Sequence, residues 1–204
     1  MAAGAALVGT RYVAGSVGDA VLFVVAVLGM QLRLICNLLD GMVAVEGGKS
    51  SPVGEIYNDL PDRIADPVIL VGAGYATLVA AGETTALVAR WGVELGWLAA
   101  ALALLTAYTR VLGRGIGGGI HFVGPMAKQH RMAVLTVACL VSSGLSLGPE
   151  AARCWGGVVV FAALAVISVG CVLTIVRRTR LISDTLNRTS AAAAPPPPAG
   201  GRSP

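Results

Sequence analysis

The stretch Val158–Val176, which reads VVVFAALAVISVGCVLTIV, contains no charged residue. About 20 consecutive apolar residues are enough for an α-helix to cross the hydrocarbon core of a bilayer, so this stretch predicts a membrane span. Five further apolar runs precede it, the first of which is weaker and contains Arg11: Ala2–Val17, Ala20–Leu32, Pro67–Ala81, Gly92–Leu105 and Met132–Leu147. We therefore expect an all-α integral membrane protein with about six transmembrane helices in a single bundle.

The composition supports this assignment. The chain is 55% hydrophobic and only 13% charged, whereas about 25% of the residues of a soluble domain are charged. We expect one membrane domain over residues 1–180 and a disordered polar tail, rich in Ala and Pro, over residues 181–204. The four cysteines show no C-x-x-C or Cys/His spacing, which argues against a zinc site and a disulfide framework.

The charged residues predict the orientation in the membrane. With six helices and a cytoplasmic N-terminus, the only basic residues on the outer side are Arg90 and Arg153. The cytoplasmic segments then hold Lys49, Arg110, Arg114, Lys128, Arg131, Arg177, Arg178, Arg180, Arg188 and Arg202. This asymmetry follows the positive-inside rule. We expect a multi-pass protein of the bacterial inner membrane that contacts membrane lipid and does not bind nucleic acid.

Polar residues recur at helical spacing in the first third of the chain. Asn37, Asp40, Gly41 and Ala44 share one helix face, because residues three, four and seven apart do so. Gly54, Asn58 and Asp62 follow at intervals of four, after a short Gly-rich loop. The two helices must therefore pack antiparallel, and their polar faces can converge. Polar side chains within a membrane are costly and usually mark a functional site.

This spacing resembles the signature of the CDP-alcohol phosphatidyltransferase family, D-x-x-D-G-x-x-A-R followed after eight residues by G-x-x-x-D-x-x-x-D. The resemblance implies an enzyme of phospholipid biosynthesis. Such an enzyme transfers a substituted phosphate group from a CDP-alcohol, such as CDP-diacylglycerol, to a small polar alcohol acceptor and releases CMP. It also implies Mg²⁺ or Mn²⁺ as the cofactor and an active site that faces the cytoplasm. A homodimer is compatible with the resemblance.

The resemblance also implies roles for individual residues. Asp62 would be the general base. The metal-ligand positions would be Asn37, Asp40, Asn58 and Asp62. The CDP pocket would be lined by Asp40, Gly41, Ala44 and Gly54. Four basic residues farther along the chain would bind phosphate or acceptor groups: Arg110, Arg114, Lys128 and Arg131. Membrane topology and contacts with anionic lipid headgroups explain these four cations equally well.

Three positions depart from the signature. Asn37 and Asn58 replace its first and third Asp, and Val45 replaces its Arg. An Asn oxygen can bind a hard cation but contributes no charge, so we expect one tightly held metal ion. The same substitutions support an alternative, a catalytically impaired relative that binds CDP-lipid and acts as a regulatory or scaffold protein. Arg33 and Arg63 are candidates to replace the missing Arg, and Asp66 is either a further site residue or an interfacial carboxylate.

Overall fold

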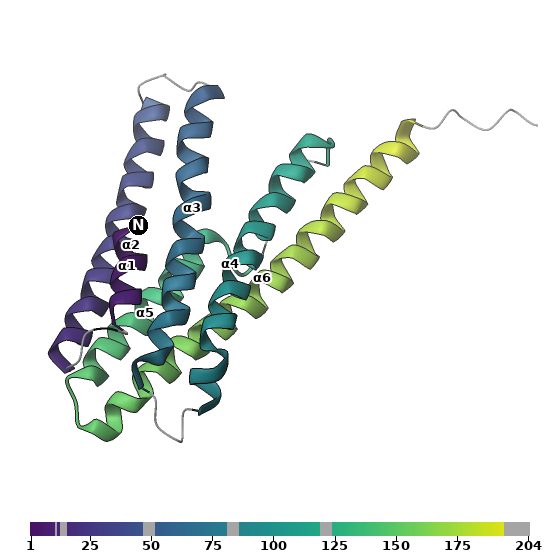
Figure 1. Ribbon diagram of the computed structural model, residues 1–204. Helices are drawn as coiled ribbons and strands as arrows, with labels where there is room; N and C mark the ends of the chain where they lie inside the picture. The colour runs from purple at the N-terminus through teal and green to yellow at the C-terminus, as the bar shows by residue number, and fades with distance from the viewer. Residues whose placement is uncertain (11, 13–15, 47–51, 81–85, 119–123, 194–204) are drawn as a thin grey trace, which may run out of the picture.

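The computed structural model describes residues 1–10, 12, 16–46, 52–80, 86–118 and 124–193, and all its regular elements there are helices (Figure 1). The predicted all-α architecture is therefore confirmed for the described part of the chain. The elements are α1 (Ala2–Gly9), α2 (Ser16–Glu46), α3 (Pro52–Ala76), the 3₁₀ turn η1 (Thr77–Ala80), α4 (Ala86–Gly115), α5 (Lys128–Ser146) and α6 (Glu150–Ala193).

The helices pack as a ring. α2 packs against α5, α5 against α6, α6 against α4, and α4 against α3. The short α1 closes the ring because it contacts both α2 and α3. Fully buried side chains from several helices, among them Phe23, Leu70, Leu135 and Leu164, form the core.

Three helices are long and apolar enough to cross a membrane: Val17–Leu39, Ala86–Gly115 and Glu150–Ser190. Their outward faces carry large apolar side chains, such as Leu28 and Leu32 on α2, which are 62% and 64% exposed. Exposed apolar surface of this extent is typical of a lipid-facing helix. The described residues therefore contain three candidate membrane spans, which indicate a membrane protein.

Several predicted boundaries were wrong. α1 has only 8 residues, so at 1.5 Å per residue it is far too short for a span of about 30 Å. α4 begins at Ala86, before the apolar run Gly92–Leu105 that predicted it. α6 continues to Ala193, so residues 181–193 are helical, where the composition predicted a disordered tail. In this extension Ile182 is only 9% exposed, and its side chain lies against Gly118 after the end of α4.

Small residues let the helices approach closely. A Cβ atom added to Gly96 of α4 would lie 2.7 Å from the Cα atom of Gly74 of α3. Real Cβ atoms do not come so close to a neighbouring backbone, so this crossing requires glycine at both positions. The contact fixes α3 against α4, and these two helices carry many of the charged residues of the candidate site.

Candidate functional site

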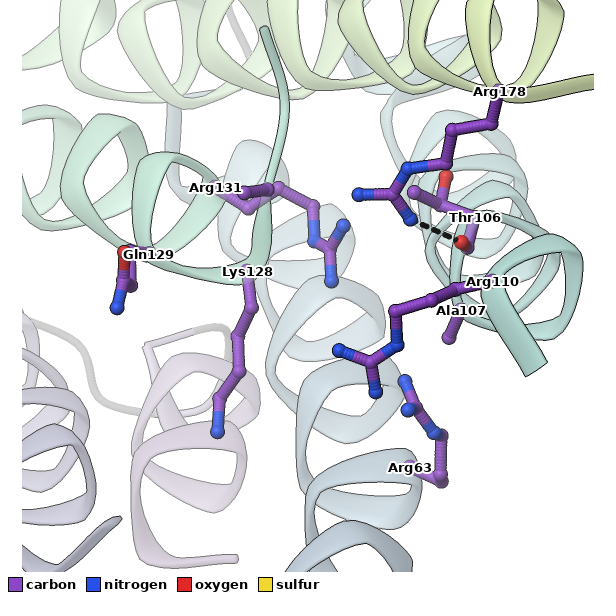
Figure 2. Close-up of a pocket in the computed structure, with 9 residues that line it drawn as sticks. Arg63, Thr106, Ala107, Arg110, Lys128, Gln129, Arg131 and Arg178 are labelled. Carbon is purple, nitrogen blue, oxygen red and sulfur yellow. Dashed lines mark hydrogen bonds between the residues drawn. The ribbon is translucent and has the colours of Figure 1, made fainter. Parts of the chain in front are cut away.

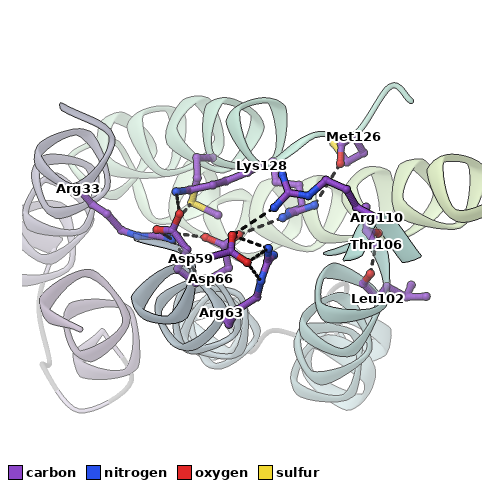
Figure 3. Close-up of polar contacts among 12 residues, drawn as sticks. Arg33, Asp59, Arg63, Asp66, Leu102, Thr106, Arg110, Met126 and Lys128 are labelled. Carbon is purple, nitrogen blue, oxygen red and sulfur yellow. Dashed lines mark hydrogen bonds and ion pairs between the residues drawn. The ribbon is translucent and has the colours of Figure 1, made fainter. Parts of the chain in front are cut away.

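Charged side chains from four helices gather in one region of the bundle (Figure 3). They come from α2, the first half of α3, the last turns of α4 and the N-terminus of α5. The apolar half of α3 begins only at Pro67, so the acidic residues of α3 precede it. Two groups of contacts can be separated, one centred on Asp62 and Asp66 and the other on Asp59.

Asp62 accepts hydrogen bonds from three side chains. Its Oδ1 atom accepts one from Nη2 of Arg33 at 2.7 Å and one from Nδ2 of Asn37 at 3.1 Å. Its Oδ2 atom forms an ion pair with Nζ of Lys128. Burial alone would raise the pKa of Asp62. The hydrogen bonds from Lys128, Arg33 and Asn37, together with the positive charge of Lys128, outweigh burial and lower the pKa below its usual 3.8. Asp62 is therefore a carboxylate at neutral pH.

Asp66 lies one turn farther along α3 and is only 5% exposed. Its Oδ1 atom lies 2.5 Å from Nη1 of Arg33, and its Oδ2 atom lies 3.0 Å from Nη2 of Arg131. The other terminal nitrogen of Arg131 donates to the carbonyl oxygen of Met126 at 3.1 Å. Arg33 thus bridges Asp62 and Asp66, and the buried charge of Asp66 has two partners, as a buried carboxylate requires. We call Arg33, Asn37, Asp62, Asp66, Lys128 and Arg131 the inner cluster.

Asp59 forms a second group at a more exposed position. Its carboxylate binds the guanidinium group of Arg63, one turn along α3, with contacts of 2.6 and 2.7 Å. It also accepts a bond of 3.2 Å from Nη2 of Arg110 on α4. The side chain of Asp59 is 40% exposed. Asp59 and Arg63 thus form an i,i+4 ion pair on α3, and Arg110 extends it to a neighbouring helix.

A cavity of about 240 Å³ lies next to both groups (Figure 2). Five cationic side chains and no carboxylate of the described residues line it. We call it the cationic cavity, and its lining comprises Arg63, Thr106, Ala107, Arg110, Ala127, Lys128, Gln129, Arg131 and Arg178. The guanidinium group of Arg178 on α6 is held in place, because its Nη1 atom donates to the carbonyl oxygen of Thr106 at 2.7 Å.

The start of α5 contributes backbone N–H groups as well as side chains to this cavity. Ala127 is the residue that precedes the helix, and Lys128 and Gln129 form its first turn. Backbone N–H groups at a helix N-terminus carry a partial positive charge, which attracts anions and repels cations. Lys128 and Arg131 are therefore unfavourable for helix stability at this end. Their carboxylate partners in the inner cluster compensate for that cost and hold both cations at the cavity.

The connection between α4 and α5 depends on Gly124. Its φ of 138° lies in the region that favours glycine, and an added Cβ atom would collide with the side chain of Thr174 on α6. Two residues later, the backbone N–H of Met126 donates to Oγ1 of Thr174 at 3.1 Å. These contacts anchor Gly124 and Met126 on α6 immediately before Lys128, and so set the position of the α5 N-terminus.

The structure brings together several of the residues predicted from the motif. Asn37 and Asp62 meet across α2 and α3, as the convergence of the two polar faces predicted. The backbones of Asp40, Gly41, Ala44, Gly54 and Asn58 are helical, but their side chains lie outside the described part of the structure. Of the four predicted basic residues, Arg110, Lys128 and Arg131 line the cationic cavity, whereas Arg114 is exposed one turn beyond Arg110.

Sequence reasoning missed part of the site. Arg178 was counted only among the basic residues that predict the membrane orientation, although it is only 6% exposed and lines the cavity. Asp66 was left unassigned, and the bridge that Arg33 forms between two carboxylates was not foreseen. The available signal was a cation at the end of an apolar run, because Arg33 must find a carboxylate partner inside the bundle.

The residues expected to bind a metal ion are suitable in type. Asn37 and Asp62 offer oxygen atoms, which Mg²⁺ and Mn²⁺ prefer. In the arrangement seen, however, Asn37 turns its amide nitrogen toward Asp62, and Lys128 covers Oδ2 of Asp62. Among the side chains that the structure describes, no group of three or more His, Cys, Asp or Glu is placed to hold a metal ion. An ion at Asp62 would therefore compete with Lys128.

Comparisons with known protein families and with curated proteins found no match to this sequence. The functional interpretation consequently depends on the site geometry and on the spacing of the motif.

Proposed function

We propose that this membrane protein transfers a substituted phosphate group from a CDP-alcohol, such as CDP-diacylglycerol, to a small alcohol acceptor with release of CMP. The observation that carries the proposal is the position of the Asn37–Asp62 pair beside a cavity lined by five cations. A phosphate-transfer site needs both features, because oxygen ligands and a base serve the reacting groups while cations hold the negatively charged substrate.

The cationic cavity suits a phosphate group. Guanidinium groups bind phosphate through paired hydrogen bonds, and four of the five cations are arginines. Its volume of about 240 Å³ suits a phosphate or a small alcohol phosphate better than a nucleotide-linked lipid. We therefore place the acceptor in this cavity and the CDP group along the α2–α3 motif, with CDP-diacylglycerol approaching from the membrane.

Asp62 lies between these two regions and is suited to accept the proton of the acceptor hydroxyl. It is ionised at neutral pH, as a base must be, and Arg33 and Asn37 fix its orientation. For proton transfer its Oδ2 atom must be released by Lys128, which also lines the cavity and can turn toward the substrate phosphate. Mg²⁺ or Mn²⁺, if bound by Asn37, Asp40, Asn58 and Asp62, would supply charge neutralisation of the pyrophosphate.

We also propose that the site faces the cytoplasm of a bacterial inner membrane. The basic residues that precede and follow the spans at this end, such as Lys128 and Arg180, support this orientation. The apolar half of α3 from Pro67 and the part of α5 from Met132 would complete the membrane domain beside the three long helices.

A second function is favoured by a specific observation. Both oxygen atoms of Asp62 are engaged by nitrogen donors of the protein itself. A protein in which these contacts persist would bind a CDP-lipid without turnover and serve as a regulatory or scaffold protein. The Asn residues at positions 37 and 58 favour the same outcome.

One experiment distinguishes the two functions. The purified protein in nanodiscs is incubated with labelled CDP-diacylglycerol, Mg²⁺ or Mn²⁺, and a panel of alcohols and alcohol phosphates. Acceptor-dependent release of CMP supports the transferase. Saturable binding of CDP-diacylglycerol without CMP release supports the binding protein, and the absence of both contradicts both proposals.

A further inference from the structure

The cationic cavity is bordered by a carboxylate that does not line it. Asp59 contacts Arg63 and Arg110, and both of these arginines line the cavity. A phosphate that enters the cavity therefore meets two guanidinium groups that already have an anionic partner in the protein. The other three cations, Lys128, Arg131 and Arg178, lie on α5 and α6.

We propose that Asp59 is a specificity-determining residue of the cationic cavity, because its carboxylate competes with the substrate phosphate for Arg110 and partly neutralises Arg63. The inference rests on the proposed function to the extent that the cavity binds a phosphate group. Before any ligand binds, the Asp59 carboxylate already neutralises part of the positive charge on one side of the cavity. Phosphate binding therefore requires that an arginine exchange Asp59 for the phosphate.

The contact distances indicate which arginine is exchanged. Arg63 approaches both oxygen atoms of Asp59, at 2.7 and 2.6 Å. Arg110 makes a longer bond of 3.2 Å to one of them. These ion pairs are partly exposed, with 33% of the Arg110 side chain accessible, and exposed pairs are weak. Arg110 therefore turns from Asp59 to the phosphate, while Arg63 remains with Asp59.

The charge of Asp59 also separates ligands by their own charge. Coulomb repulsion from a fixed carboxylate is about twice as large for a dianion as for a monoanion at the same position. Asp59 thus lowers the affinity for a phosphate monoester or inorganic phosphate more than the affinity for a phosphate diester. The wild-type cavity consequently prefers dianions less strongly than the same five cations would without Asp59 beside them.

The test measures binding of inorganic phosphate and of dimethyl phosphate to the full chain in phosphatidylcholine nanodiscs by calorimetry. Asp59→Asn should bind inorganic phosphate about three- to tenfold more tightly than wild type, with a smaller gain for dimethyl phosphate. Asp59→Glu should restore the wild-type affinity. Asp184→Asn, which removes the same charge from an exposed site on α6, should change neither affinity.

Arg110→Gln removes the cationic partner of the same ion pair, and we expect it to change the phosphate affinity in the opposite direction. It should weaken phosphate binding, because it removes a cation that the phosphate uses. If the pair only held α3 against α4, both variants would bind phosphate more weakly. Weaker or unchanged binding by Asp59→Asn, with wild-type binding intact, therefore overturns this inference alone.

A competition experiment distinguishes a lipid headgroup from a soluble phosphate as the ligand of the cavity. Nanodiscs that contain phosphatidic acid should compete with inorganic phosphate if a lipid headgroup occupies the cavity, and should not compete if the phosphate is soluble. The Asp59→Asn effect is expected for whichever ligand binds. Failure of wild type and of all variants to bind either ligand would overturn both this inference and the role of the cavity in the proposed function.

Discussion

Arg33 shows how a single side chain sets the character of the site. It lies in an apolar helix that is long enough to span the membrane, and its two terminal nitrogens contact Asp62 and Asp66. The two carboxylates differ in their surroundings: Asp66 is buried between Arg33 and Arg131, whereas Asp62 is more accessible and contacts Lys128. We infer that Asp66 stabilises the bundle and that Asp62 is the reactive carboxylate.

The structural role of Asp66 gives a prediction. Asp66→Asn should lower the free energy of unfolding by about 3 kcal/mol, because it leaves the buried guanidinium group of Arg131 without its anionic partner. Unfolding in detergent, followed by circular dichroism, measures this loss. The control is Asp184→Asn, for which we expect almost no change; equal stability of the two variants would show that the Asp66 contacts do not stabilise the fold.

Lys128 gives a second prediction at this scale. Lys128→Gln uncovers one oxygen of Asp62, so the affinity for Mn²⁺ should rise about three- to tenfold. The amount of free Mn²⁺, followed by electron paramagnetic resonance, reports this affinity without relying on turnover. Arg188→Gln removes a cation at an exposed position of α6 and serves as the control. Unchanged Mn²⁺ binding by the Lys128 variant would contradict competition between Lys128 and the metal ion.

At the scale of the helices, the sequence predicted some elements well and others poorly. The apolar run Ala20–Leu32 and the polar face that ends at Ala44 were expected to be helical, and both lie within α2 (Ser16–Glu46). A disordered tail was predicted from residue 181, but a change from apolar to polar residues does not end a helix, and α6 continues to Ala193. The segment after Arg177 contains no Gly or Pro before Pro195, so nothing in it breaks the helix.

The candidate site was predictable only within each helix. Spacing placed Asn37 and Asp62 on the facing sides of two helices that a short loop makes antiparallel, and they meet. The partners of Arg33, and the position of Arg178 at the cavity, depend on how distant helices rotate and cross. Spacing along one helix contains no information about that rotation.

The crossing of α3 and α4 gives a prediction for this scale. Gly96→Ala should destabilise the protein by about 1–3 kcal/mol, because the added methyl group would overlap with the backbone of Gly74. Gly144→Ala on α5 is the matched control, since nothing lies within 4 Å of the position of its added Cβ atom. That variant should be neutral or slightly stabilising, and thermal unfolding of both compares them. Equal stability would show that α3 and α4 do not pack this closely.

At the scale of the whole molecule, three long apolar helices among the described residues are candidate membrane spans, and their exposed apolar faces indicate a membrane protein. The charged residues then predict its orientation. In a cysteine-free background, Arg188→Cys should react with a membrane-impermeant thiol reagent only in inverted vesicles, and Arg153→Cys only in intact cells. The reverse labelling pattern would place the candidate site on the outer side, away from the cytoplasmic supply of nucleotide-activated substrates.

The central claim is that the inner cluster and the cationic cavity together transfer a phosphate group, with Asp62 as the base. The most direct measurement compares CMP release from CDP-diacylglycerol by wild type and by Asp62→Asn, both folded in nanodiscs and supplied with acceptors and Mg²⁺ or Mn²⁺. We predict acceptor-dependent CMP release by wild type and its loss in Asp62→Asn, with the helical content unchanged. Full CMP release by Asp62→Asn, or none by wild type with any acceptor, would contradict the claim.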